Sequence, residues 1–270
     1  MRSSVSLALA AATLCVLSTG CQPDTVRIAF RPAEGAAYGF EVTTDARTTT
    51  TLPGEPPDVT RDTAVLREEQ RILEIGGDRV RVEVVVRIPD VGTQTYVVQL
   101  DRAAQLTEVE TVEGIPTATL GELGLTEIFP AAAGAPPDRR LRTGDHWTID
   151  DRVLVAGLPE PTRLSGTGEL VELGVIDGHD TATVRSHYAL PLSQTTTTPT
   201  GQGTLEGSQF TDVTVTYDLA DGAVRRARAT TTGRFTLRLS PPPNAPARPI
   251  VGTLQIEVHS ETTRVDLPDG

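Results

Sequence analysis

The sequence predicts an all-β fold of antiparallel meander hairpins, arranged as a curved sheet, a half-barrel or a sandwich. The first observation is the alternation over residues 79–88, where valines and an isoleucine alternate with mostly charged side chains. Successive side chains of a strand point to opposite faces, so this pattern indicates a strand with one buried and one hydrated face. The second observation is the wealth of threonine and valine, because β-branched residues suit a pleated surface. The third is that Gly-containing turn sequences separate the runs.

The alternation recurs towards the end of the chain, over residues 213–219, 235–239 and 254–258. Helical periodicity is weak throughout, and only Leu120–Phe129 is a candidate for a short helical turn. Residues 240–249 contain too many prolines for a central strand. They are expected to form an exposed loop between the last two long strands.

Four turn sequences predict hairpins between neighbouring strands. Glycine at positive φ is what two-residue hairpin turns require. Hairpins imply antiparallel pairing, in which one face of the sheet is apolar and the other polar. The turns are Gly76-Gly77-Asp78 between 63–75 and 79–88, Asp177-Gly178 between 163–175 and 180–190, Asp221-Gly222 between 209–219 and 223–239, and Asp101–Ala104 between 93–100 and 105–112.

A Pro- and Ala-rich linker over residues 130–142 divides the chain into a first β half, 34–129, and a second β half, 143–270. Each half opens with a glycine, two further residues and a large ring, at Gly35–Tyr38 and Gly144–Trp147. A repeated unit would give two similar antiparallel halves. The alternative is that any β-meander has this appearance, and the sequence leaves both interpretations open.

Residues 1–20 have the features of a secretory signal peptide. A single cation, Arg2, precedes an apolar segment that runs from Val5 to Leu17. A cationic tip, an apolar segment of about 7–15 residues and small residues before a cut site are typical of such signals. A membrane-spanning helix needs about 20 apolar residues, so this segment is too short to be one.

The end of the signal, Leu17-Ser18-Thr19-Gly20-Cys21, resembles the cleavage motif of bacterial lipoprotein precursors. The resemblance implies cleavage between Gly20 and Cys21 and a diacylglyceryl thioether on the cysteine, with acyl chains such as palmitate. Gly20 fits the small residue at the cut, whereas the usual leucine lies one position early. The alternative is an ordinary cleaved signal with a chance cysteine.

Acylation would make Cys21 a membrane anchor, because two or three acyl chains hold a protein stably at a bilayer. Residues 21–33 would then be a lipidated tether. The protein would lie on the extracytoplasmic side of the cell membrane or of the outer membrane. The residue after the cysteine, Gln22, is not aspartate, which in this family favours the outer membrane of a two-membrane cell.

The part after the signal also resembles a loosely defined family of uncharacterised β-rich bacterial lipoproteins. The matching elements are Gly35 with Tyr38, the Thr-rich stretch Thr43–Thr51, Phe129-Pro130, and Gly144-Asp145-His146-Trp147. This family supplies no activity that the resemblance could imply for the chain.

The composition excludes several partners. The chain carries 24 basic residues, all arginine, and 36 acidic ones, for a net charge of −12. This balance argues against nucleic acid as a partner. Aromatic residues make up 4% of the chain, which argues against ring-stacking platforms. Cys15 would leave with the signal and Cys21 would be acylated, so neither a disulfide nor a cysteine metal site is expected.

No catalytic motif, metal site or cofactor site is predicted. The four histidines, His146, His179, His187 and His259, lack the spacing of zinc ligands. Tyr38 and Trp147 are interpreted as core anchors at strand starts. Four aspartates near two hairpin tips could gather around Ca²⁺, although ordinary turn chemistry explains them as well. They are Asp177, Asp180, Asp218 and Asp221.

These features predict a non-enzymatic lipoprotein of the cell envelope with a binding or scaffolding role. Its partners would be membrane lipid, through the acylated Cys21, and an apolar ligand or an envelope protein. The first alternative is a carrier of lipid or glycolipid that uses the apolar concave face of a half-barrel, an analogy at the level of the fold. The second is a hydrolase with an unrecognised site, which would require clustered His, Asp and Glu in a cleft.

Overall fold

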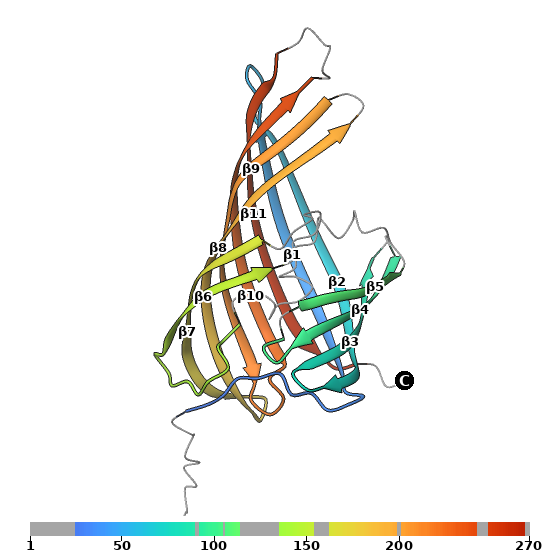
Figure 1. Cartoon of the computed structure of the whole chain (residues 1–270), viewed down its shortest axis with the longest axis vertical. Coiled ribbons are helices and arrows are strands. Elements are labelled where there is room, and N and C mark those ends of the chain that lie inside the picture. The colour runs from blue at the N-terminus through green and yellow to red at the C-terminus, as the bar shows by residue number, and fades with distance from the viewer. Residues whose placement is uncertain are drawn as a thin grey trace, which may run out of the picture.

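The residues that the structure describes form eleven strands, and all of them belong to one antiparallel sheet (Figure 1). The computed structural model describes residues 25–89, 92–104, 106–113, 135–153, 162–198, 201–241 and 248–267. These ranges contain no helix, and hence none of the length and apolar character needed to cross a membrane. The strands are β1 (Ala37–Thr51), β2 (Asp58–Gly76), β3 (Arg79–Ile88), β4 (Gly92–Asp101), β5 (Leu106–Glu113), β6 (His146–Val153), β7 (Thr162–Ile176), β8 (His179–Thr198), β9 (Gly201–Asp218), β10 (Val224–Ser240) and β11 (Ile250–Val265).

Pairing between the first and last strands joins the two halves of the chain. The order across the sheet is β5-β4-β3-β2-β1-β11-β10-β9-β8-β7-β6. β1 pairs with β11 from Gly39 opposite Val265 to Thr51 opposite Thr253. β5 and β6 are the two edges, and within the described residues they do not pair with each other. The predicted antiparallel curved sheet or half-barrel is therefore confirmed, and the described strands form one sheet rather than the two of a sandwich.

The predicted hairpins are present, and residues at positive φ make their turns. Gly77 has φ 56°, and the turn between β7 and β8 places Asp177 and Gly178 at φ 52° and 80°. Gly222 follows β9 at φ 71°. Glycine is required here both by this positive φ and because a Cβ would lie 2.0 Å from the carbonyl oxygen of Ala29. These local turn signals correctly predicted the hairpin pairs that the turns connect.

The two halves begin with the same hydrogen-bond pattern. Gly35, at φ 76°, donates its N–H to the carbonyl of Ile72, whose N–H returns to the carbonyl of Ala36. Gly144, at φ 86°, donates to Leu170, whose N–H returns to Asp145. A register shift follows in each half, directly after Ile72 and directly after Leu170. The predicted likeness of the two strand starts therefore extends to their backbone geometry.

The hydrophobic core lies on one face of the sheet, which we call the concave face. Val80, Val82, Val84 and Val86 of β3 are each no more than 1% exposed, as the alternation predicts. β9 contributes buried residues from the same face, Val213, Val215 and Tyr217. The turns β2–β3, β7–β8 and β9–β10 mark the end of the molecule that we call the base (Figure 1).

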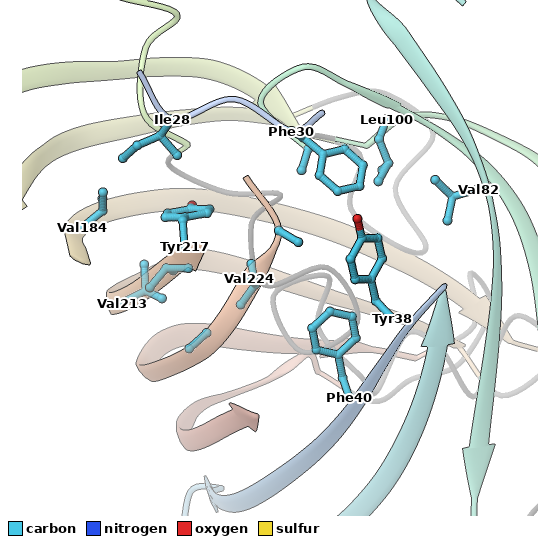
Figure 2. Close-up of a cluster of buried hydrophobic side chains, with 14 of the residues drawn as sticks. Ile28, Phe30, Tyr38, Phe40, Val82, Leu100, Val184, Val213, Tyr217 and Val224 are labelled. Atoms are coloured by element: carbon cyan, nitrogen blue, oxygen red, sulfur yellow. The ribbon is translucent and has the colours of Figure 1, made fainter. Parts of the chain in front are cut away.

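Residues 25–31 form a strap that crosses the base and closes the core. Val26 and Leu141 exchange two backbone hydrogen bonds, of 2.8 and 2.7 Å. The N–H groups of Phe30 and Arg31 donate to the carbonyls of Arg102 and Asp221, which belong to turns of different halves. Figure 2 shows Phe30 beside Leu100 and Tyr38, while Ile28 lies on the side of Val184 and Tyr217. The strap therefore ties both halves of the sheet together.

The strap differs from the sequence prediction, which assigned residues 21–33 to a tether. Val26, Ile28 and Phe30 are 6%, 4% and 4% exposed, so this part of the predicted tether is bound to the domain. The physical reason is a short apolar run in which Val26, Ile28, Ala29 and Phe30 are buried and Arg27 is exposed. Because prolines flank this run at positions 23 and 32, the sequence favoured a tether over a segment packed on the core.

Six strands, β1, β2 and β8–β11, continue well beyond the core, and we call this part the extension (Figure 1). The register of β1 with β2 runs to Thr50 opposite Asp58. β8 pairs with β9 as far as Thr198 opposite Gly201. Several earlier predictions lie outside the described residues: the cleavage motif, the helical turn at 120–129, and Phe129-Pro130.

Candidate functional site

An apolar strip runs along the concave face of the extension. Phe235 in this strip is 5% exposed, and the other members are half-buried. The strip lies beyond the continuous core cluster, and Leu190, which packs against that cluster, links the two. Its members are Leu192, Leu205, Phe235, Leu237, Leu254, Ile256 and Val258.

Strand register brings these side chains together. Leu237 on β10 pairs with Leu205 on β9, and Phe235 pairs with Leu254 on β11. Residues directly opposite each other in an antiparallel pair have Cβ atoms about 4.5–5.5 Å apart, so their side chains are in contact range. The strip is therefore one continuous surface across four strands.

Two glycines explain why Phe235 is buried in an otherwise open region. A Cβ on Gly207 would lie 2.8 Å from Cδ1 of Phe235, and a Cβ on Gly233 would lie 2.5 Å from its Cε2. The phenyl ring thus lies over backbone that carries no side chain. Glycine inside a strand commonly marks such a close approach.

The neighbouring strands give the same face a polar margin. On β1, Thr48 and Thr50 pair with Ile256 and Leu254 of the strip. Thr60 on β2 pairs with Thr48, and Asp62 lies two residues further along the same face. The concave face of the extension is therefore apolar on β8–β11 and carries hydroxyl and carboxylate groups on β1 and β2. Such a surface suits a ligand with an apolar chain and a polar head.

Glu68 is buried in the core beneath the extension, and the sequence analysis missed it. Its side chain is on the concave face of β2 and the residue is 2% exposed. Gln70 donates Nε2–H to Oε1 of Glu68 at 2.6 Å, and Oε2 has no hydrogen-bond partner. Burial raises the pKa of Glu68 to about 8, against a smaller lowering by the Gln70 amide. The carboxyl group is therefore mostly protonated at neutral pH.

The phenol of Tyr96 lies near this acid. Its hydroxyl is buried without a hydrogen-bond partner, and burial, with the charge of ionised Glu68, raises its pKa. Both side chains are therefore mostly neutral at pH 7. In sequence, the signal for this site is the interruption of the apolar alternation of β2 at positions 68 and 70.

The base contains a second buried acid, Asp218, with a cationic environment. Arg225 Nη1 lies 2.9 Å and His179 Nδ1 lies 3.0 Å from its Oδ2. Burial raises the pKa of Asp218, but the N–H of Ala220, Arg225 and His179 together outweigh that effect and leave the pKa lowered. Asp218, one of the four hairpin acids that could gather around Ca²⁺, is thus held by Arg225 and His179.

Asp221 has a similar role on the other side of the base. The Tyr38 hydroxyl donates to its Oδ2 at 3.1 Å, and Arg264 Nη1 lies 3.8 Å away. The Arg264 guanidinium also lies 4.7 Å from the centre of the Tyr38 ring. Within the described ranges, no group of three or more His, Cys, Asp or Glu side chains is arranged to hold a metal ion.

The histidines lie apart from one another. His187 Nδ1 lies 2.7 Å from Asp212 Oδ1 on the solvent-facing side of the sheet, and His259 contacts Glu257 and Thr230. His146 is exposed, and its neighbour Asp145 accepts from the N–H of Arg142 at 2.9 Å. Sequence adjacency therefore brought no His–Asp pair together, as expected for neighbours on a strand.

The two predicted aromatic anchors pack as interpreted. Tyr38 is 3% exposed and belongs to the core cluster, and Trp147 packs against that cluster. A Cβ on Gly168 would lie 2.3 Å from Cε2 of the Trp147 indole, so the ring rests on that glycine. The predicted processing residues Gly20 and Cys21 lie outside the described residues.

Comparison with known proteins gives little similarity. No known protein family matches the chain, and no curated protein matches it. Among solved structures, the chain is similar to Ail, the attachment invasion locus protein of Yersinia pestis, with 11% sequence identity and a TM-score of 0.12. That alignment covers 85% of this chain and 99% of Ail. A similarity at this level does not inform the fold or the function of this chain.

Proposed function

We propose that this protein is an extracytoplasmic lipoprotein, anchored to a membrane through an acylated Cys21, that binds an amphiphilic lipid on its concave face without chemical conversion. The observation that carries the proposal is the apolar strip of the extension, which continues the core face into a region with only partial cover. Ligand sites for apolar molecules are typically concave and lined by hydrophobic residues with few polar groups.

The kind of ligand follows from the apolar strands β8–β11 and the polar strands β1 and β2 of the extension. Apolar side chains on β8–β11 would contact an acyl chain, because burial of apolar area stabilises a complex by about 25 cal/mol per Å². Threonine hydroxyls on β1 would hydrogen-bond a polar head. A protein tethered to a bilayer also has lipid as the most abundant amphiphile within reach.

The anchor is tested by replacing the acylated residue. Cys21→Ser is expected to release the protein from the membrane fraction of producing cells, since the thioether can no longer form. The amino-terminal peptide of the wild-type protein is expected to carry a diacylglyceryl mass on Cys21. Membrane retention of the serine variant, or an unmodified wild-type peptide, would contradict the anchor.

The strip is tested with a fluorescent fatty acid as the probe. Leu205→Asn combined with Leu237→Asn places two polar groups opposite each other in the strip. Each lost leucine contact is expected to weaken probe binding about tenfold. The matched control is Phe210→Asn with Val251→Asn, since both residues are 44% exposed and lie on the opposite face of β9 and β11.

Circular dichroism melting first establishes that both double variants fold. The proposal requires that the control binds the probe as the wild type does and that the strip variant does not. Equal affinity of the two variants for the fatty acid would exclude the strip as the binding surface.

A further inference from the structure

The strap fixes how close the predicted anchor lies to the base. The first described residue is Thr25, and Val26 is already bound to Leu141. Only residues 22–24 lie between Cys21 and this point. Each residue spans at most about 3.6 Å, so the Cα atom of Cys21 lies within about 14 Å of that of Thr25. An acylated Cys21 would therefore hold the base, rather than the extension, at the membrane surface.

The strap and the segment bound to it carry a charge opposite in sign to that of the chain. The strap and its neighbours, residues 25–33 and 135–145, together carry five arginines and two aspartates. Their net charge is +3, whereas the whole chain has −12. The two segments are joined by the hydrogen bonds between Val26 and Leu141, so their charges form one local group.

Ion pairs account for both aspartates of this group. Asp138 accepts two hydrogen bonds from the Arg27 guanidinium, which lowers the pKa of that carboxyl. Asp145 lies 3.5 Å from Arg139. Three exposed arginines remain, and among the described residues no carboxylate lies within ion-pair distance of them. They are Arg31, Arg140 and Arg142.

We infer that Arg31, Arg140 and Arg142 form a footprint that contacts the anionic headgroups of the membrane carrying the protein. Guanidinium groups bind phosphate oxygens through paired N–H donors, and their charge persists at any physiological pH. Basic residues next to a lipid anchor add electrostatic attraction to anionic lipid. The anchor at Cys21 and the cationic strap would both bring the strap side of the base to the membrane surface, which leaves the concave strip accessible. This inference rests on the proposed membrane anchoring.

The test uses a chain that begins at Gln22 and therefore has neither signal nor anchor, while it keeps every described residue. Its partition onto vesicles of phosphatidylglycerol and of phosphatidylcholine is measured by co-sedimentation at low and high salt. We expect preference for phosphatidylglycerol that disappears at high salt. The triple variant Arg31→Gln, Arg140→Gln, Arg142→Gln is expected to lose about fivefold in partition per residue, or roughly a hundredfold in total.

The control carries the same change of charge at the opposite end of the molecule. Arg234→Gln, Arg238→Gln and Arg248→Gln remove three exposed arginines of the extension, which likewise have no carboxylate partner among the described residues. Their distance from the surface should exceed the screening length of about 10 Å at 0.1 M salt, so partition should stay within twofold of wild type. An equal loss in both triple variants, or no preference for phosphatidylglycerol, would overturn the footprint.

These experiments can contradict the footprint without contradicting the anchor, and the reverse. Arginine-dependent binding of the shortened chain together with an unmodified Cys21 peptide from membranes would keep the footprint and contradict the anchor. An acylated Cys21 with unchanged binding of the Arg31, Arg140 and Arg142 variant would keep the anchor and contradict the footprint.

Discussion

Two buried acids, Glu68 and Asp218, show how neighbours set the behaviour of a residue. Both are at most 3% exposed. Asp218 lies between Arg225 and His179, so its charged form is stabilised and its pKa is lowered despite burial. Glu68 has only the Gln70 amide as a hydrogen-bond partner, and burial raises its pKa to about 8. Of these two acids, only Glu68 lacks a cation that would offset the cost of burying its charged form.

This difference predicts that Glu68 makes the protein less stable as pH rises. In the unfolded chain Glu68 ionises near pH 4.5, whereas in the folded chain it keeps its proton until about pH 8. The folded state therefore binds more protons than the unfolded state between pH 4.5 and 8. The contribution of Glu68 to the free energy of unfolding falls across this range. Glu68→Gln, which keeps an acceptor for Gln70, removes this fall.

Denaturant unfolding at pH 4.5 and pH 7 checks this prediction. Relative to wild type, Glu68→Gln should gain about 3 kcal/mol between the two pH values. Glu83→Gln, on the opposite face of β3, is the control and should keep the wild-type pH dependence. A Glu68→Gln variant whose stability parallels that of wild type at both pH values would contradict the buried neutral acid.

A second residue-level prediction concerns the contact of Trp147 with Gly168. Gly168→Ala places a Cβ where the indole lies, 2.3 Å from Cε2, so the ring must move. Overpacking of this kind typically costs about 1–3 kcal/mol. Because Trp147 is the sole tryptophan, its emission reports the shift directly. Gly76→Ala, with no atom within 4 Å of the new Cβ, is the control. Unchanged emission and melting of Gly168→Ala would be inconsistent with the contact.

At the scale of elements, the strap holds together two halves whose strands begin alike. Phe30 N–H and Arg31 N–H bind turns from different halves, and the Phe30 ring lies 6.3 Å from that of Tyr38. The apolar side chains of the strap thus fill the space between the strand ends. Cohesion of the base depends on this segment as well as on the pairing of β1 with β11.

Removal of one strap side chain should therefore unfold the protein more easily. Phe30→Ala is expected to lower the free energy of unfolding by about 3–5 kcal/mol, since a buried phenylalanine is lost. Phe210→Ala, with the ring 44% exposed on the opposite face, is the matched control and should cost far less. Chemical denaturation of both variants measures the difference. Equal costs would mean that the strap is dispensable for the core.

Sequence patterns predicted the elements that depend on local chemistry. The alternation in β3 and the glycine at Gly77 act within a few residues, so the hairpin they encode was predicted correctly. The strap and the β1–β11 seam join segments far apart in the chain, which no local pattern specifies. Alternation at residues 235–239 also predicted the apolar side of β10, but a period reports which face is apolar and not how deeply it is covered. The strip therefore became visible only in the fold.

On the scale of the whole molecule, two opposite ends have different characters. The base gathers the strap, its arginines and the buried ion pairs, and it lies next to the predicted anchor. The extension presents the apolar strip on one face and leaves it partly exposed. A protein anchored at its base would hold the strip away from the bilayer, where an exposed apolar surface is stable only if it is occupied or small.

Native mass spectrometry of the protein extracted from its own membrane tests lipid binding on the concave face most directly. We expect a mass equal to that of the acylated chain plus one non-covalently bound lipid, which dissociates on collisional activation. The Leu205→Asn, Leu237→Asn variant should keep the acyl mass and lose the bound lipid. A wild-type protein that carries its anchor but no second lipid, or a variant that retains that lipid, would contradict the account.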